Sequence, residues 1–99
     1  MALTPKQRAQ LKKLAHPLKP IHQVGKEGLS DATLGAILDA LNHRELMKVR
    51  VQDTAPTTAR ETGEAIAARF PEVEHVQTIG KTVVLYRRHP EKPVISLVR

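Results

Sequence analysis

The sequence predicts a single domain of the α/β (α+β) class, in which helices cover a four-stranded mixed β-sheet. Three segments repeat their apolar residues with the period of a helix, and four short segments have the composition of strands. Their order along the chain is α-β-α-β-α-β-β. The 99 residues, 40% of them hydrophobic, suffice for one modest core. We expect residues 1–99 to form one domain, with a core of about residues 3–88 and a short tail at 89–99.

The first helix is predicted to begin at Thr4-Pro5, an N-cap followed by proline at the first helical position. At 100° per residue, Leu11 and Leu14 lie on one side, which we expect to face the core, and the lysines lie on the other side. The two prolines of segment 16–20 end the helix.

A short strand is predicted at 21–24, followed by a glycine-containing turn and a second helix over 31–43. Ser30 is a suitable N-cap for this helix. Four apolar residues spaced by three or four positions predict its buried side: Leu34, Ile37, Leu38 and Leu41. Leu38 is central in this set.

The second half of the chain predicts a strand at 46–51, a helix at 58–70 and two strands at 73–79 and 82–87. Gly80-Lys81 between the last two strands is typical of a type II′ hairpin turn. Helical crossovers imply parallel pairing of the early strands, and the hairpin adds an antiparallel pair. Tyr86 is expected to be half-buried, and the apolar stretch 94–98 is expected to add an edge contact to the sheet.

Charge is distributed unevenly along the chain, whose formal net charge is +6. Residues 1–26 contain six basic and no acidic residues, residues 27–74 have a net charge of −4, and residues 75–99 have a net charge of +4. Segregated positive charge favours a polyanionic partner, most often nucleic acid. Phe70 and Tyr86 are the only aromatic residues, so binding by stacked aromatic platforms is disfavoured and phosphate contacts should dominate.

Other classes of function find little support in the sequence. Gly80-Lys81-Thr82 lacks the earlier glycine of a P-loop and precedes a strand rather than a helix. The five histidines have no helical ligand spacing and no cysteine to complete a tetrahedral metal site. No nucleophile–base pair is recognisable, so we expect a protein that is not an enzyme and that uses no metal, cofactor or small-molecule substrate. Without an apolar run long enough for a membrane or a signal peptide, the expected location is the cytoplasm.

The turn Gly25-Lys26-Glu27-Gly28 has the G-x-x-G spacing of loops that grip a sugar-phosphate backbone. Glycines allow close approach of the backbone, and the start of the next helix presents free N–H groups. The same pattern is also typical of an ordinary strand-to-helix turn, and Glu27 is an unfavourable charge beside phosphate. Both interpretations remain open from the residues alone.

Four segments in order resemble the CRM domain family (chloroplast RNA splicing and ribosome maturation), whose stand-alone bacterial members are YhbY-like proteins. These segments are LKKLAHPLKP at 11–20, VGKEGLS at 24–30, ELMKV at 45–49 and IGKTVVLYR at 79–87. The resemblance spans about residues 3–97 and is weakest in the helix 58–70. It implies a fold similar to the C-terminal domain of translation initiation factor 3, RNA binding through the G-x-x-G loop, and association with precursors of the large ribosomal subunit.

The sequence therefore predicts a protein, expected to be monomeric, that engages ribosomal RNA during large-subunit assembly. A DNA-binding or nucleoid module and a ribosome-associated adaptor for other proteins are the alternatives. The predicted RNA-binding residues are Lys12, Lys13, Lys19, Gly25, Lys26, Glu27, Gly28, Lys48, Lys81, Arg87 and Arg88.

Overall fold

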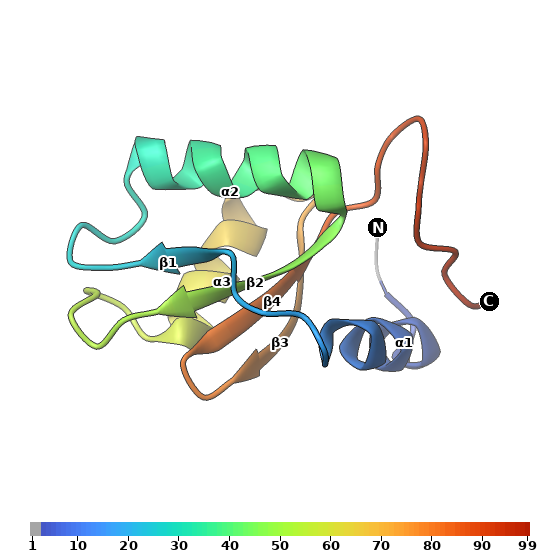
Figure 1. Ribbon diagram of the computed structural model, residues 1–99, viewed down its shortest axis with the longest axis horizontal. Coiled ribbons are helices and arrows are strands. Elements are labelled where there is room, and N and C mark those ends of the chain that lie inside the picture. The colour runs from blue at the N-terminus through green and yellow to red at the C-terminus, as the bar shows by residue number, and fades with distance from the viewer. Residues whose placement is uncertain (1–2) are drawn as a thin grey trace.

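The computed structural model describes residues 3–99 and contains three helices and four strands in the predicted order (Figure 1). Their bounds are α1 Pro5–Ala15, β1 His22–Val24, α2 Asp31–Arg44, β2 Leu46–Val51, α3 Ala59–Arg69, β3 Glu74–Ile79 and β4 Thr82–Tyr86. The N-caps of the three helices are Thr4, Ser30 and Thr58. Each of their side chains accepts a hydrogen bond from the backbone N–H three residues later.

The strands form one mixed sheet in the order β1-β2-β4-β3, which confirms the predicted fold class. β1 is parallel to β2, whereas β4 is antiparallel to both β2 and β3. The β3–β4 turn has two residues, with Ile79 paired to Thr82, and Gly80 has a φ of +57°. Positive φ at the first turn residue alone is the pattern of a type II′ turn.

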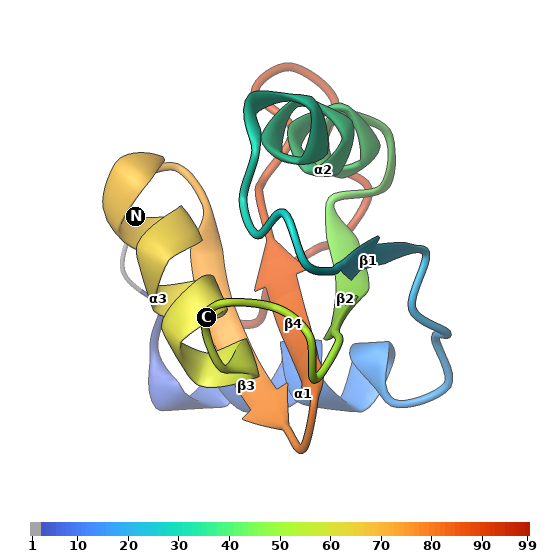
Figure 2. The same cartoon turned by 90° about the vertical axis from the view of Figure 1, so that its left-hand side faces the viewer.

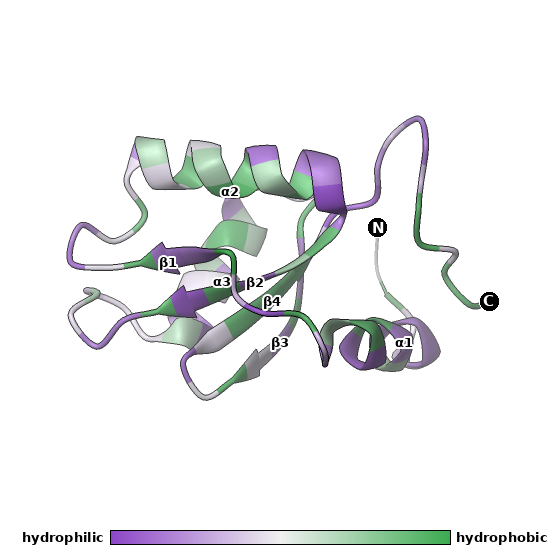
Figure 3. Cartoon of the chain, viewed as in Figure 1, coloured by the Kyte–Doolittle hydropathy of each residue, from purple (hydrophilic) through white to green (hydrophobic). Residues whose placement is uncertain are grey.

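Helices cover both faces of the sheet (Figure 2). On one face, α2 and α3 pack against Met47, Val49, Val51 and the equivalent residues of the other strands. On the opposite face, Leu11 and Ala15 of α1 pack against a smaller cluster from β2, β3 and β4. The central strand β4 is largely hydrophobic, whereas the other strands also carry hydrophilic residues and the connections after β1 and β2 are mainly hydrophilic (Figure 3). Because α1 is short, it covers only one end of its face.

Three predictions about burial are wrong. Leu14 is 44% exposed, because Leu11 and Ala15 are the residues of α1 that contact the sheet. Leu38 is only partly buried, since Leu34, Ile37 and Leu41 form the inner side of α2. Tyr86 is fully buried rather than half-buried, because α1 covers its end of β4.

The C-terminal tail forms no strand, which corrects the predicted edge contact of 94–98. It instead runs along α1, where the side chain of Gln10 bonds to the backbone of both Ser96 and Val98. Ile95 and Leu97 pack against the α1-side core. The tail thereby helps to hold α1 on the sheet.

Candidate nucleic-acid interface

The α1 side of the sheet has an open half that α1 does not cover. In β2 the side chains alternate, so Leu46, Lys48 and Arg50 point to the α1 side while Met47, Val49 and Val51 face α2 and α3. Leu46 lies under α1, whereas Arg50 is exposed. Cross-strand pairing places Val84 beside Lys48 and Thr82 beside Arg50. The open half therefore presents two cations on a largely uncharged strand surface.

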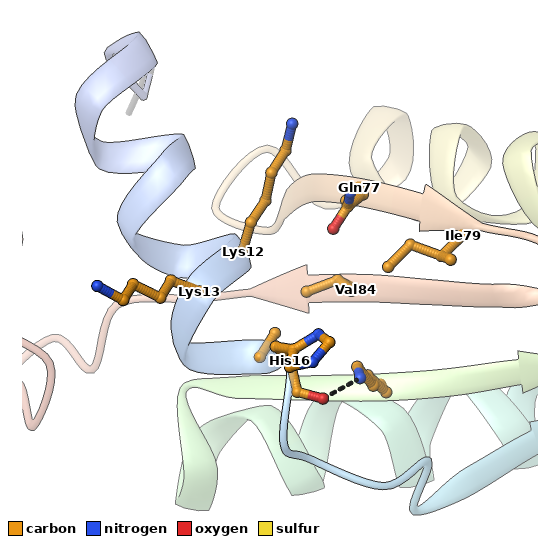
Figure 4. Close-up of a pocket in the computed structure, with 8 residues that line it drawn as sticks. Lys12, Lys13, His16, Gln77, Ile79 and Val84 are labelled. Atoms are coloured by element: carbon orange, nitrogen blue, oxygen red, sulfur yellow. Dashed lines mark hydrogen bonds between the residues drawn. The ribbon is translucent and has the colours of Figure 1, made fainter.

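A groove of about 360 Å³ lies where this open half meets the last turn of α1. Three of its lining residues are cations and none is acidic: it is formed by Lys12, Lys13, Ala15, His16, Lys48, Gln77, Ile79 and Val84. Figure 4 shows Gln77, Ile79 and Val84 on the strands, opposite Lys12 and His16 of the helix end, with Lys13 extending away from the strands. The groove can accept a polyanion without displacing any acidic group of its lining.

Lys48 is held in the groove by the end of α1. Its Nζ donates a hydrogen bond to the backbone O of His16 at 3.1 Å, the dashed contact in Figure 4. The last carbonyls of a helix carry partial negative charge, which orients this ammonium group. Two of its three donor hydrogens are available for other acceptors. Lys12 and Lys13, in the last turn of α1, are both exposed.

The glycine turn 25–28 follows β1 at the far end of the same sheet. The N–H of Gly28 donates to the carbonyl of Gly25 at 2.9 Å, which closes the turn, and Gly28 has a φ of +65°. Only glycine adopts this backbone region without strain. Lys26 and Glu27 at the tip are exposed. The turn thus offers one cation and one anion to solvent.

Lys81 lies at the tip of the β3–β4 hairpin and is already paired. Its Nζ is 2.5 Å from Oδ1 of Asp53 in the connection after β2. The hydrogen bond and charge of Lys81 lower the pKa of the Asp53 carboxyl. Both groups are largely exposed, so the ion pair contributes little to stability. Lys81 can reach a phosphate only in competition with Asp53.

The other three predicted cations lie away from the groove. Lys19 lines a separate cavity of about 170 Å³ with Leu18, Ile21 and Arg44. Arg87 donates to Oδ1 of Asn42 at the end of α2. Arg88 lines a cavity formed mainly by the C-terminal tail. The structure therefore groups Lys12, Lys13 and Lys48 around the groove. It places Lys19, Arg87 and Arg88 elsewhere.

Arg50 is an exposed cation on the same face of β2 as Lys48, outside the groove lining, and the predicted set omits it. The alternation Lys48-Val49-Arg50 could have indicated it, because residues two apart in a strand share a face. Arg8, a basic residue of the same helix α1 as Lys12, binds the protein itself. Its guanidinium donates to the backbone O of His75 at 2.9 Å and of Val76 at 2.7 Å, so this cation supports the edge of β3.

Other kinds of site find no support in residues 3–99. No group of three or more histidine, aspartate or glutamate side chains is placed to hold a metal ion there. Within the same residues, no helix has the length and apolar character needed to cross a membrane.

Comparison with known proteins identifies the family. Residues 3–87 match the model of the CRS1 / YhbY (CRM) domain. The chain belongs to this family. The matched region contains the groove, the glycine turn and the β3–β4 hairpin, and it ends just before the C-terminal tail.

Relatives of similar length share much of the sequence. The chain is 41% identical over 95 residues to the probable RNA-binding protein YqeI of Bacillus subtilis, covering 96% of this chain and 98% of that one. It is 41% identical over 92 residues to an RNA-binding protein of Haemophilus influenzae, covering 93% and 92% of the two chains. These family members are named as RNA-binding proteins, not as enzymes, in agreement with the expectation for this chain.

A solved structure shares the fold. The solution structure of SAV1595 from Staphylococcus aureus, for which RNA binding has been suggested, superposes with a TM-score of 0.79 at 36% identity. It covers 98% of this chain and 100% of that one.

Proposed function

We propose that this protein binds structured RNA through the α1–sheet groove and the glycine turn, and that its RNA is ribosomal RNA in precursors of the large subunit, in the cytoplasm. The observation that carries the proposal is the acid-free cluster of Lys12, Lys13 and Lys48 on an open sheet face. Phosphate contacts of this kind supply affinity, and groove shape supplies orientation.

The sheet face favours structured RNA over an unstructured strand. In residues 3–99 neither aromatic ring is exposed on this sheet face, since Tyr86 is fully buried and Phe70 packs against the α2–α3 core. Single-strand binders depend on exposed rings on which bases stack. Folded RNA can be recognised instead through its phosphates and 2′-hydroxyls. Membership of the CRM family and the names of the relatives support RNA as the partner.

Fluorescence anisotropy tests the RNA preference directly. Labelled fragments of large-subunit ribosomal RNA are titrated with the protein. Unlabelled large-subunit RNA, small-subunit RNA and duplex DNA of equal length are the competitors. We expect large-subunit RNA to compete best. If four to six phosphates are neutralised, the slope of log K against log salt is about −3 to −5. Equal competition by duplex DNA contradicts the RNA proposal and supports the nucleoid alternative.

Sedimentation tests the proposed association in cells. Tagged protein in a sucrose gradient should comigrate with large-subunit precursors and leave them after mild RNase treatment. Retention after RNase treatment, with loss on removal of one ribosomal protein, contradicts the RNA proposal and supports the adaptor alternative.

A further inference from the structure

The glycine turn is in contact with the connection between β2 and α3. The two segments lie side by side at one end of the molecule (Figures 1 and 2). A Cβ atom at Gly25 would lie 2.9 Å from Oε1 of Gln52, and a Cβ atom at Gly28 would lie 2.8 Å from Cγ of Pro56. Both glycines therefore allow the close approach of a neighbouring loop.

Hydrogen bonds join the same two segments. The N–H of Gln52 donates to the carbonyl of Val24 at 2.8 Å, and its side-chain amide donates to Oε1 of Gln23. The N–H of Ala55 returns to the carbonyl of Gln52 at 3.0 Å, and Ala55 packs against the α2–α3 core. The segment 52–56 is thereby fixed to the body of the protein, and it can fix the glycine turn in its place.

The two contacts differ in stiffness. Pro56 presents a rigid ring to Gly28, whose positive φ already excludes most other residues. Gln52 presents the end of a flexible side chain, so an added methyl group at Gly25 would displace its carboxamide and break the bond to Gln23. A second substitution that removes the carboxamide, Gln52→Ala, would leave room for the methyl group at Gly25.

We propose that Gln52 and Pro56 are positioning residues for RNA binding, and that the glycines of the turn serve this loop–loop contact rather than direct contact with phosphate. The segment 52–56 holds the turn at the end of β1, where Lys26 is exposed to solvent. This inference rests on the proposed function, because it assigns the turn a place in the RNA interface. Holding the loop in its bound geometry raises affinity by reducing the ordering cost.

A double-mutant cycle on the full chain tests the assignment, with Gly25→Ala, Gln52→Ala and the double variant. The probe is the large-subunit RNA fragment that the unmodified protein binds. We expect each single variant to weaken binding about three- to tenfold. The double variant should bind as Gln52→Ala does, because the carboxamide that the methyl group displaces is already gone. Gly35→Ala is the matched control, since no atom lies within 4 Å of a Cβ at this position of α2.

Two further measurements separate positioning from a loss of folding. The denaturant midpoints should stay close to the unmodified value, because Gln52 is exposed. Without RNA, hydrogen exchange at the amide of Gly28, which closes the turn by its bond to the carbonyl of Gly25, should accelerate in Gln52→Ala and in Pro56→Ala.

The outcomes distinguish this inference from the proposed function. Additive losses in the cycle, or unchanged exchange at the turn in Gln52→Ala, overturn the positioning role and leave RNA binding by the groove intact. If the unmodified protein binds no RNA, the proposed function itself fails, whereas the exchange measurement still reports whether segment 52–56 holds the turn.

Discussion

The Glu45 carboxylate accepts a hydrogen bond from the backbone N–H of Ile95 at 2.8 Å, although the two residues lie 50 positions apart. The same carboxylate accepts bonds from the N–H groups of Val94 at 2.8 Å and His89 at 2.7 Å. Glu45 is 1% exposed and has a φ of +62°. Three backbone N–H groups of the C-terminal tail thus compensate the burial of this carboxylate.

Glu45→Gln should release the tail and lower the free energy of unfolding by about 1.5–3 kcal/mol, the range for hydrogen bonds to a charged group. The carboxamide has one acceptor oxygen, and its NH₂ would face at least one of the tail N–H groups. Chemical denaturation measures the loss, and hydrogen exchange at Val94 and Ile95 should accelerate. Glu91→Gln, at an exposed tail position, is the control. Protected tail amides in Glu45→Gln would contradict this role.

The Glu45 contact should also weaken in acid. Burial raises the pKa of Glu45, but the hydrogen bonds from the tail and the charge of His89 outweigh it, so the pKa lies below its ordinary value of 4.5. Since the unfolded state then binds the proton more readily, the contribution to stability is complete above about pH 5 and is lost as pH falls through the lowered pKa. The unfolding midpoint of the unmodified protein should therefore fall more steeply below about pH 5 than that of Glu45→Gln. Parallel curves would contradict this assignment.

His75 should make the protein less stable as pH falls below neutral. Burial lowers its pKa from the ordinary value of 6.5, the charges of Arg8 and Arg60 lower it further, and Glu64 opposes them. In the unfolded chain His75 is therefore protonated near pH 6.5, whereas in the folded chain it is protonated only at lower pH. As a result, stability falls as pH falls below about 6.5. Denaturant midpoints between pH 8 and pH 5.5 should fall less in His75→Gln than in the unmodified protein. An NMR titration that gives His75 a pKa at or above 6.5 would contradict the prediction.

Ile37→Ala should destabilise the protein by about 2–5 kcal/mol, and Leu38→Ala should cost clearly less. Ile37 is fully buried between α2 and the sheet, whereas Leu38 lies partly outside this contact. Both variants remove apolar atoms from the same helix, so their difference in denaturant midpoint reports the orientation of α2. Equal losses would mean that α2 is rotated from the position described.

The sequence predicted the order of elements and the mixed sheet because caps, prolines and apolar periods are local signals. It misassigned Leu14, Leu38 and Tyr86 because burial depends on which neighbouring element covers a residue. The periodicity of a helix defines an apolar side only to within about one residue on either flank. The tail was misplaced for a related reason, since its partners Gln10 and Glu45 are polar and lie far away in the sequence.

For the candidate site, residue type was predictable and grouping was not. The basic segment before β1 and the glycine turn are visible in the sequence, but only the fold separates Lys12 from Arg8, which bonds to β3. Likewise, the pairing of Lys81 with Asp53 depends on the approach of two loops that 27 intervening residues connect.

Asp53→Asn should strengthen RNA binding about two- to fivefold at low salt, because it frees Lys81 from its ion pair at the hairpin tip. Asp39→Asn changes the net charge equally on the exposed side of α2 and is the matched control. Anisotropy titrations of both variants at two salt concentrations measure the difference. Equal gains would show that only the net charge matters and that Lys81 makes no contact with the RNA.

Lys12→Glu should weaken RNA binding more than Lys6→Glu does. Both lysines are exposed on α1 and both substitutions change the net charge by −2, but only Lys12 lines the groove. Lys12→Glu removes a phosphate contact from the groove and should weaken binding about tenfold or more. Lys6→Glu changes only the long-range electrostatic attraction of the RNA, and this smaller effect should disappear at higher salt. Arg88→Glu extends the comparison to a cation that lies by the tail. If the three variants lose affinity equally, with unchanged circular dichroism, binding follows net charge and the groove is not the RNA site.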